Sequence, residues 1–191
     1  MKRILLDVDG VVADFIGKTF QDLVAEGGPA HTAEDLQEWD LHVLVHEKWD
    51  ATMESFWHRE GWVDTMHPYQ GAREGVHALR DAGHEVYWVT TAMHAAPFWM
   101  WERRQWLLRE MDATDHDILF ASHKHIVLGD IFVDDKPANV SRWAQAHPKG
   151  HGVLWAQPWN RLATFSSGGR TNKWENILHL ADGKISSVWQ T

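Results

Sequence analysis

Short apolar runs alternate with helical patterns along most of this chain, and this alternation limits the fold more than any other feature. The runs are rich in β-branched and aromatic residues and stand at 3–7, 84–89, 118–120, 131–133 and 152–155. Between them, the spacing of apolar residues predicts helices at about 12–25, 72–82, 97–111, 139–146 and 173–180. Strands that alternate with helices build a mostly parallel sheet covered by helices on both faces. The sequence therefore predicts a three-layer α/β fold.

The stretch from about 16 to 70 departs from this alternation. It contains short helical patterns rich in tryptophan, and no strand-like alternation of apolar and polar residues. Thr-Ala-Glu-Asp at 32–35 is typical of a capping box at a helix start, and Pro-Tyr-Gln-Gly at 68–71 is typical of a turn. We expect 16–70 to form a mostly helical insertion, with 1–15 and 71–191 forming the core domain.

Acidic and hydroxyl residues stand at the C-terminal ends of three predicted strands: Asp7, Asp9, Thr90, Thr91, Asp134 and Asp135. Ligands of parallel α/β sheets bind outside these strand ends, so the side chains are expected to converge. Carboxylates packed closely repel one another unless a cation compensates, and oxygen ligands suit Mg²⁺. A single Asp after a strand often only caps the next helix. Two acidic pairs and a Thr-Thr pair at three strand ends favour a magnesium site instead.

The same residues resemble the motifs of the haloacid dehalogenase-like phosphohydrolases. Asp-Val-Asp-Gly-Val-Val at 7–12 is similar to their first motif, and the apolar strand ending at Thr90 is similar to their second. Asp134-Asp135, after an apolar strand, resembles the fourth motif, and Lys124, ten residues before Asp134, resembles the third. The resemblance implies a Rossmann-like parallel sheet with a small helical cap inserted after the first strand.

The resemblance also implies a catalytic role for each of these residues. Asp7 would attack phosphorus and form an aspartyl-phosphate. Asp9 would protonate the leaving oxygen and then accept a proton from the hydrolytic water. Thr90 and Lys124 would bind phosphoryl oxygens, and Lys136 is the competing lysine. The implied Mg²⁺ ligands are Asp7, the Asp9 backbone carbonyl and the Asp134-Asp135 pair.

Within that superfamily the sequence most resembles the 5′(3′)-deoxyribonucleotidases. Asp-Val-Asp-Gly-Val-Val-Ala-Asp-Phe at 7–15 is similar to their extended first motif, and Trp-Ala-Gln-Pro-Trp-Asn-Arg at 155–161 to a late strand and turn of bacterial relatives. The resemblance implies a nucleoside monophosphate substrate, with aromatic rings stacked on the base. The candidate substrate-binding residues are Asp9, Phe15, Trp57, Trp62, Thr90, Thr91 and Lys124.

Three alternatives stay open at this point. Phe15, Trp57 and Trp62 could instead pack the insertion against the core. The substrate could be another small phosphate ester, such as a sugar phosphate or phosphoglycolate. The chain could also bind a nucleotide without hydrolysing it. Relatives often place Ser and Pro after the second-motif Thr, whereas Thr91-Ala92 stands here, so base selectivity is open.

Composition excludes several other classes of protein. The formal net charge of −9 disfavours binding to nucleic acid polymers, whose affinity comes largely from neutralised phosphates. No apolar run approaches the ~20 residues of a membrane helix. The absence of cysteine excludes disulfides, thiolate metal sites and a cysteine nucleophile. We expect a cytoplasmic protein, and the resemblance adds a homodimer as an expectation.

Overall fold

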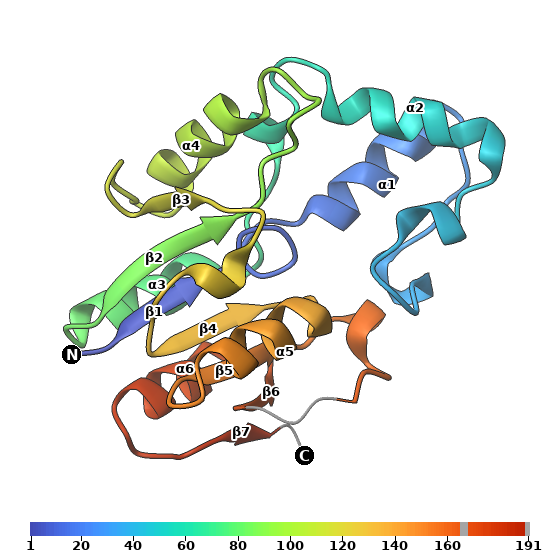
Figure 1. The fold of residues 1–191 in the computed structure, drawn as a ribbon. Helices are drawn as coiled ribbons and strands as arrows, with labels where there is room; N and C mark the ends of the chain where they lie inside the picture. Colours follow the sequence, from blue (N-terminus) through green and yellow to red (C-terminus); the bar gives the residue numbers. More distant parts are fainter. Residues whose placement is uncertain (165–167, 190–191) are drawn as a thin grey trace.

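The computed structural model describes residues 1–164 and 168–189, and these form one parallel sheet with helices on both faces (Figure 1). The seven strands lie in the order β3-β2-β1-β4-β5-β6-β7, and every neighbouring pair is parallel. They are β1 (Arg3–Leu6), β2 (Glu85–Thr90), β3 (Ile118–Phe120), β4 (Ile131–Asp134), β5 (His151–Trp155), β6 (Gly169–Thr171) and β7 (Val188–Trp189). The predicted α/β fold is confirmed.

Six α-helices and five short 3-10 helices complete the described chain. The α-helices are α1 (Phe15–Ala25), α2 (Glu47–Trp57), α3 (Ala72–Asp81), α4 (Trp99–Glu110), α5 (Pro137–Ala146) and α6 (Trp174–Ala181). The 3-10 helices are η1 (Ala33–Asp35), η2 (Leu41–Val43), η3 (Val63–Thr65), η4 (Lys124–Ile126) and η5 (Pro158–Asn160). The first helix begins later than its apolar pattern predicts, because the Asp14 side chain caps it by accepting a hydrogen bond from the Gly17 N–H at 2.9 Å.

The alternation of side chains along β1 separates two hydrophobic layers. Ile4 and Leu6 belong to the larger core cluster, which includes Val76 of α3. Leu5 points to the opposite face and joins a smaller cluster that includes Trp143 of α5. Successive residues of a strand face opposite sides of a sheet, so both faces of β1 are buried, as a near-continuous apolar run predicts.

The two strands at one edge of the sheet, β6 and β7, were not predicted. β6 is three residues long, Gly-Arg-Thr, and β7 is two residues long. Neither segment carries an apolar run of even three residues, the length of the shortest runs from which strands are predicted here. Their strand conformation comes from pairing with β5 and with each other, which is tertiary context rather than local propensity.

The segment from 16 to 70 contains α1, η1, η2, α2 and η3, and no strand, as its sequence predicts. Its two ends meet beside the loop after β1. The Tyr69 N–H donates to the Val12 carbonyl at 2.8 Å, and the Asp14 N–H donates to the His67 carbonyl at 3.0 Å. Figure 1 shows α1 and α2 beyond the C-terminal ends of the central strands. The division into a separate cap and core stays a prediction. None of the described helices combines the length and apolar character that crossing a membrane requires.

Gly75 allows α3 and α6 to pack closely, and its replacement gives a test of this contact. A Cβ on Gly75 would overlap the Trp174 side chain. Helix propensity alone favours alanine by about 1 kcal/mol. We expect the overlap to dominate, so that Gly75→Ala lowers the free energy of unfolding by about 1–3 kcal/mol in urea titration. Glu74→Ala, an exposed change on the same helix, should stay within about 0.5 kcal/mol of wild type. Stabilisation by Gly75→Ala would show that the contact is loose.

Candidate active site

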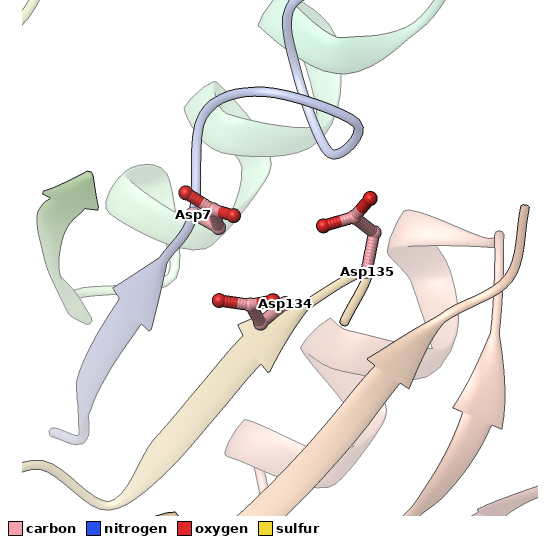
Figure 2. A group of neighbouring side chains, drawn as sticks. All are labelled: Asp7, Asp134 and Asp135. Atoms are coloured by element: carbon pink, nitrogen blue, oxygen red, sulfur yellow. The ribbon is translucent and has the colours of Figure 1, made fainter. Parts of the chain in front are cut away.

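The strand order places the acidic residues at one crevice. From β1 the chain adds β2 and β3 on one side and then β4 to β7 on the other, so the order reverses between β1 and β4. Open α/β sheets bind ligands at such a reversal, outside the carboxyl ends of the strands. Asp7 follows β1 directly, and Asp134 is the last residue of β4. Figure 2 shows Asp7, Asp134 and Asp135 turned toward one another, and each offers an oxygen within 4.8 Å of the others.

Lys124 lies between two of these carboxylates. Its Nζ is 2.6 Å from Asp7 Oδ1 and 2.8 Å from Asp134 Oδ2, and the residue is 5% exposed. Burial works against the positive charge, but Asp134 and Asp7 outweigh it and raise the pKa of Lys124. Lys136 instead places its Nζ 3.9 Å from the centre of the Trp39 ring. The ammonium group of Lys124, and not that of Lys136, therefore contacts the acidic side chains.

The three buried carboxylates differ in how many donors they have. Asp134 accepts from Lys124, from the Lys136 N–H at 2.8 Å and from Asn139 Nδ2 at 3.1 Å. Asp135 accepts from Trp159 Nε1 at 2.8 Å through Oδ2, whereas its buried Oδ1 has no partner among the described residues. A buried carboxylate oxygen without a donor is costly unless a cation binds it. Asp134 is therefore saturated, and Asp135 is available to a metal ion.

Burial and mutual repulsion also affect proton binding in this group. Burial raises the pKa of Asp7 to about 7, with the neighbouring charge of Asp134 adding to the effect and Lys124 opposing it. Burial, together with the charges of Asp134 and Asp7, raises the pKa of Asp135 well above its usual value. These carboxylates resist ionisation without a cation, so their chemistry fits a divalent metal ion.

The loop after β1 is fixed against the acidic residues by the last third of the chain. Gly10 has φ +80°, and a Cβ there would overlap the Asp135 carboxylate, so glycine is required on both grounds. Gln157 Nε2 donates to the Gly10 carbonyl at 2.6 Å, and Asn160 Nδ2 donates to the Asp135 carbonyl at 2.7 Å. Sequence reasoning assigned Gln157 and Asn160 no individual role, and pointed to them only through the resemblance of residues 155–161 to bacterial relatives.

Asp9 lies apart from Asp7, Asp134 and Asp135, which together form the acidic triad. Its Oδ1 accepts a hydrogen bond from Arg103 Nη2 at 2.5 Å. Any part of Asp9 in metal binding would then fall to its backbone carbonyl, as the resemblance implies. Sequence reasoning missed Arg103, which stands inside α4 and matches no motif. No sequence signal identifies it, because only the folded structure shows that this position of α4 is fully buried.

The two threonines at the end of β2 occupy different environments. Thr90 is buried, and its hydroxyl has no hydrogen-bond partner among the described residues. Thr91 is exposed, its hydroxyl lies 3.5 Å from the Ala121 carbonyl, and it lines the cavity described next. Thr90 thus keeps an unused donor at the strand end where a phosphoryl oxygen is expected.

A cavity of about 690 Å³ opens onto Asp7, Asp9, Thr91 and Lys124. Its aromatic wall is formed by Phe15, Trp39, Trp57 and Trp99. The structure places Phe15 and Trp57 at this cavity, and their role in substrate binding stays a prediction. Trp39 and Trp99 were not predicted, because a tryptophan in a helical pattern does not reveal which face borders a cavity.

The structure does not place Trp62 at this cavity. It is 3% exposed, its Nε1 donates to Asp22 Oδ2 at 2.6 Å, and its ring centre lies 5.7 Å from that of Phe15. Trp62 therefore packs between the insertion and the core, which is the alternative to substrate binding that the sequence left open. Its ring supports the aromatic wall from behind.

Known proteins resemble this chain along nearly its whole length. A family model described as "5′ nucleotidase, deoxy (Pyrimidine), cytosolic type C protein" matches residues 1–184. Proteins of Bordetella pertussis and Bordetella bronchiseptica, provisionally named 5′(3′)-deoxyribonucleotidases, are each 26% identical over 180 residues, covering 92% of this chain and 94% of theirs.

Solved structures support the fold. A haloacid dehalogenase family hydrolase of Deinococcus radiodurans, with bound phosphate and sodium, has a TM-score of 0.61 at 15% identity, covering 97% of this chain and 98% of that one. A hydrolase of the same superfamily from Geobacter sulfurreducens has a TM-score of 0.56 at 16% identity, covering 94% and 99%. The solved structures show that the fold is that of haloacid dehalogenase-like hydrolases. Because the family model spans residues 1–184, the chain belongs to the cytosolic type C 5′-nucleotidase family.

Proposed function

We propose that this protein hydrolyses (deoxy)nucleoside monophosphates to nucleoside and phosphate, through an aspartyl-phosphate on Asp7 and with Mg²⁺. One observation carries the proposal. Asp7, held by Lys124 beside a buried acidic group, faces a cavity whose wall is aromatic. A nucleophile for phosphorus and a surface for a base thus share one site.

Asp7, Asp135 and the Asp9 backbone carbonyl would hold the Mg²⁺ ion. Asp135 contributes its unpartnered Oδ1, whereas Asp134 already has three donors and acts by positioning Lys124. When bound, the ion offsets the negative charge of the nucleophile and the phosphate as they approach.

The protein's own groups account for both halves of the reaction. An Asp7 oxygen attacks phosphorus while the ester P–O bond breaks, and Asp9 gives its proton to the departing alkoxide. A water molecule then attacks the phosphorus of the aspartyl-phosphate and gives a proton to Asp9, releasing phosphate and free Asp7. The Thr90 hydroxyl, at the end of β2, and the Lys124 ammonium, on η4 beside Asp7, hold the phosphoryl oxygens where this charge develops.

Support for a nucleotide comes from the cavity and from the relatives. The cavity has a volume of about 690 Å³, within the range of small-molecule sites, and Phe15, Trp39, Trp57 and Trp99 give it rings on which a base can stack. The family description and the names of the Bordetella relatives refer to the same substrate class. The cytoplasmic location and the homodimer stay predictions.

A substrate panel with and without EDTA tests the function. We expect magnesium-dependent hydrolysis in which dUMP and dTMP are better substrates than sugar phosphates or phosphoglycolate. Asp7→Asn should abolish turnover because it removes the nucleophile and keeps the side-chain shape. Retention of more than a few percent of activity would contradict covalent catalysis. A preference for sugar phosphates would contradict the assignment of a nucleotide substrate. Tight nucleotide binding without hydrolysis would show that the chain is a binding protein.

Trp57 and Trp62 form a matched pair for testing the aromatic wall. Stacking on a base is worth about 1–3 kcal/mol, so Trp57→Ala should raise KM for nucleotides about 5- to 100-fold. KM for p-nitrophenyl phosphate, which lacks sugar and base, should change far less. Trp62→Ala should mainly lower stability, because Trp62 packs behind the wall. Equal effects of Trp57→Ala on both esters would assign Trp57 to packing.

The raised pKa of Asp7 predicts how pH and Mg²⁺ alter stability. In EDTA the native state binds more protons than the unfolded state between the ordinary Asp pKa of 3.8 and the folded value of about 7. The free energy of unfolding therefore falls as pH rises through this window, and Asp7→Asn should flatten the decline. Mg²⁺ binds the ionised carboxylates, so it should raise Tm more at about pH 8 than at about pH 5. An equal rise at both pH values would argue against this metal site.

A further inference from the structure

Helix α4 places two consecutive charged residues in the interior of the protein. Glu102 is 7% exposed and accepts hydrogen bonds from the backbone N–H groups of Gly61, at 2.6 Å, and Val63, at 3.1 Å. Arg103 is fully buried and donates to Asp9. Buried charges cost stability unless they are paired. Glu102 accepts hydrogen bonds from the backbone, whereas the Arg103 side chain bonds only to other side chains among the described residues.

The surroundings of Arg103 restrict it to that one acidic partner. Its guanidinium carbon lies 5.3 Å from the ring centre of Trp99 and 5.4 Å from that of Trp106. Nη2 also lies 3.4 Å from Met66 Sδ, while Nε and Nη1 have no hydrogen-bond partner among the described residues. With two indole rings and Met66 at these distances, Asp9 is the one acidic side chain of the described residues that hydrogen-bonds to this guanidinium.

Asp9 needs such a partner because its neighbours are anionic. The Asp9 side chain is 17% exposed and lines the substrate cavity, two residues after Asp7. Without an opposing cation, its carboxylate would be repelled by Asp7 or drawn to the metal ion as an extra ligand. The contact with Arg103 engages Oδ1, so Oδ2 is the oxygen left to exchange a proton in the cavity.

We propose that Arg103 is a positioning residue, which holds the Asp9 carboxylate out of the acidic triad and aims its free oxygen at the leaving group. The inference rests on the proposed function. Arg103 does not line the cavity, so it acts through Asp9 and not on the substrate. General acid catalysis depends on the geometry of the donor before its pKa, and a fixed carboxylate supplies that geometry.

Two esters with different leaving groups test the proposal. A nucleoside leaves as an alkoxide that needs a proton, whereas p-nitrophenolate leaves without one. We expect Arg103→Met to lower kcat/KM for dUMP about 10- to 1,000-fold, a part of the roughly 100- to 10,000-fold contribution of a general acid, and to lower kcat/KM for p-nitrophenyl phosphate much less. Arg103→Lys keeps the charge but not the planar fork, and should give an intermediate loss.

A double-mutant cycle separates positioning from packing. In an Asp9→Asn background, Arg103→Met should change kcat/KM for dUMP by less than about threefold, because the two residues act as one unit. Arg104→Met is the matched control, since Arg104 is the next residue of α4 and pairs with Asp115 at the surface. It should leave both kcat/KM values near wild type.

Equal losses for the two esters, or the same loss in the Asp9→Asn background, would overturn the proposal and leave Arg103 a packing residue. If thermal unfolding shows that Arg103→Met does not fold, the two-ester comparison and the cycle are carried out with Arg103→Lys. If Asp9→Asn loses most of its activity but the Arg103 variants lower kcat/KM equally for both esters, this inference is refuted and the proposed role of Asp9 stands. An Asp9→Asn variant with wild-type kcat/KM would instead refute the proposed role of Asp9.

Discussion

The bridge that Lys124 makes between Asp7 and Asp134 is the interaction on which the rest of the site depends. Its two contacts, 2.6 Å and 2.8 Å long, join the ends of neighbouring strands β1 and β4 in the protein interior. Asp7, Asp134 and Asp135 carry three negative charges when ionised, and Lys124 offsets one of them. The remaining two match the charge of a divalent cation, and without such an ion burial raises the pKa of Asp7 and of Asp135.

Much of this arrangement could be predicted because it follows from local patterns and from sheet geometry. An apolar run followed by Asp7 or by Asp134-Asp135 identifies the end of a buried strand. In a parallel sheet those ends share one edge, so their side chains meet although Asp7 and Asp134 are 127 positions apart in the sequence. Lys124 required the resemblance as well, because a lysine in a loop has no local signature of burial.

Other features could not be predicted, because they depend on what lies opposite in the folded chain. Arg103 and Arg104 are neighbours of the same type, yet one is fully buried against Asp9 and the other pairs with Asp115 at the surface. Helical periodicity shows which side of α4 is apolar, but here that side also holds a charge whose partner comes from a distant loop. The short edge strands β6 and β7 are a second case, since their pairing partners and not their residues make them strands.

The aromatic residues show that packing and ligand binding need not be competing explanations. The Phe15 ring centre lies within 6.0 Å of four tryptophan ring centres, those of Trp39, Trp57, Trp62 and Trp99. Three of these tryptophans border the cavity with Phe15, and Trp62 lies behind them. A side chain between a cavity and a packed layer serves both, because the layer behind holds its ring rigid for whatever stacks in front. Substitution of Phe15 would therefore lower both stability and substrate binding. The two effects can be measured separately only by substituting residues that lie on one side of the wall, such as Trp62 behind it.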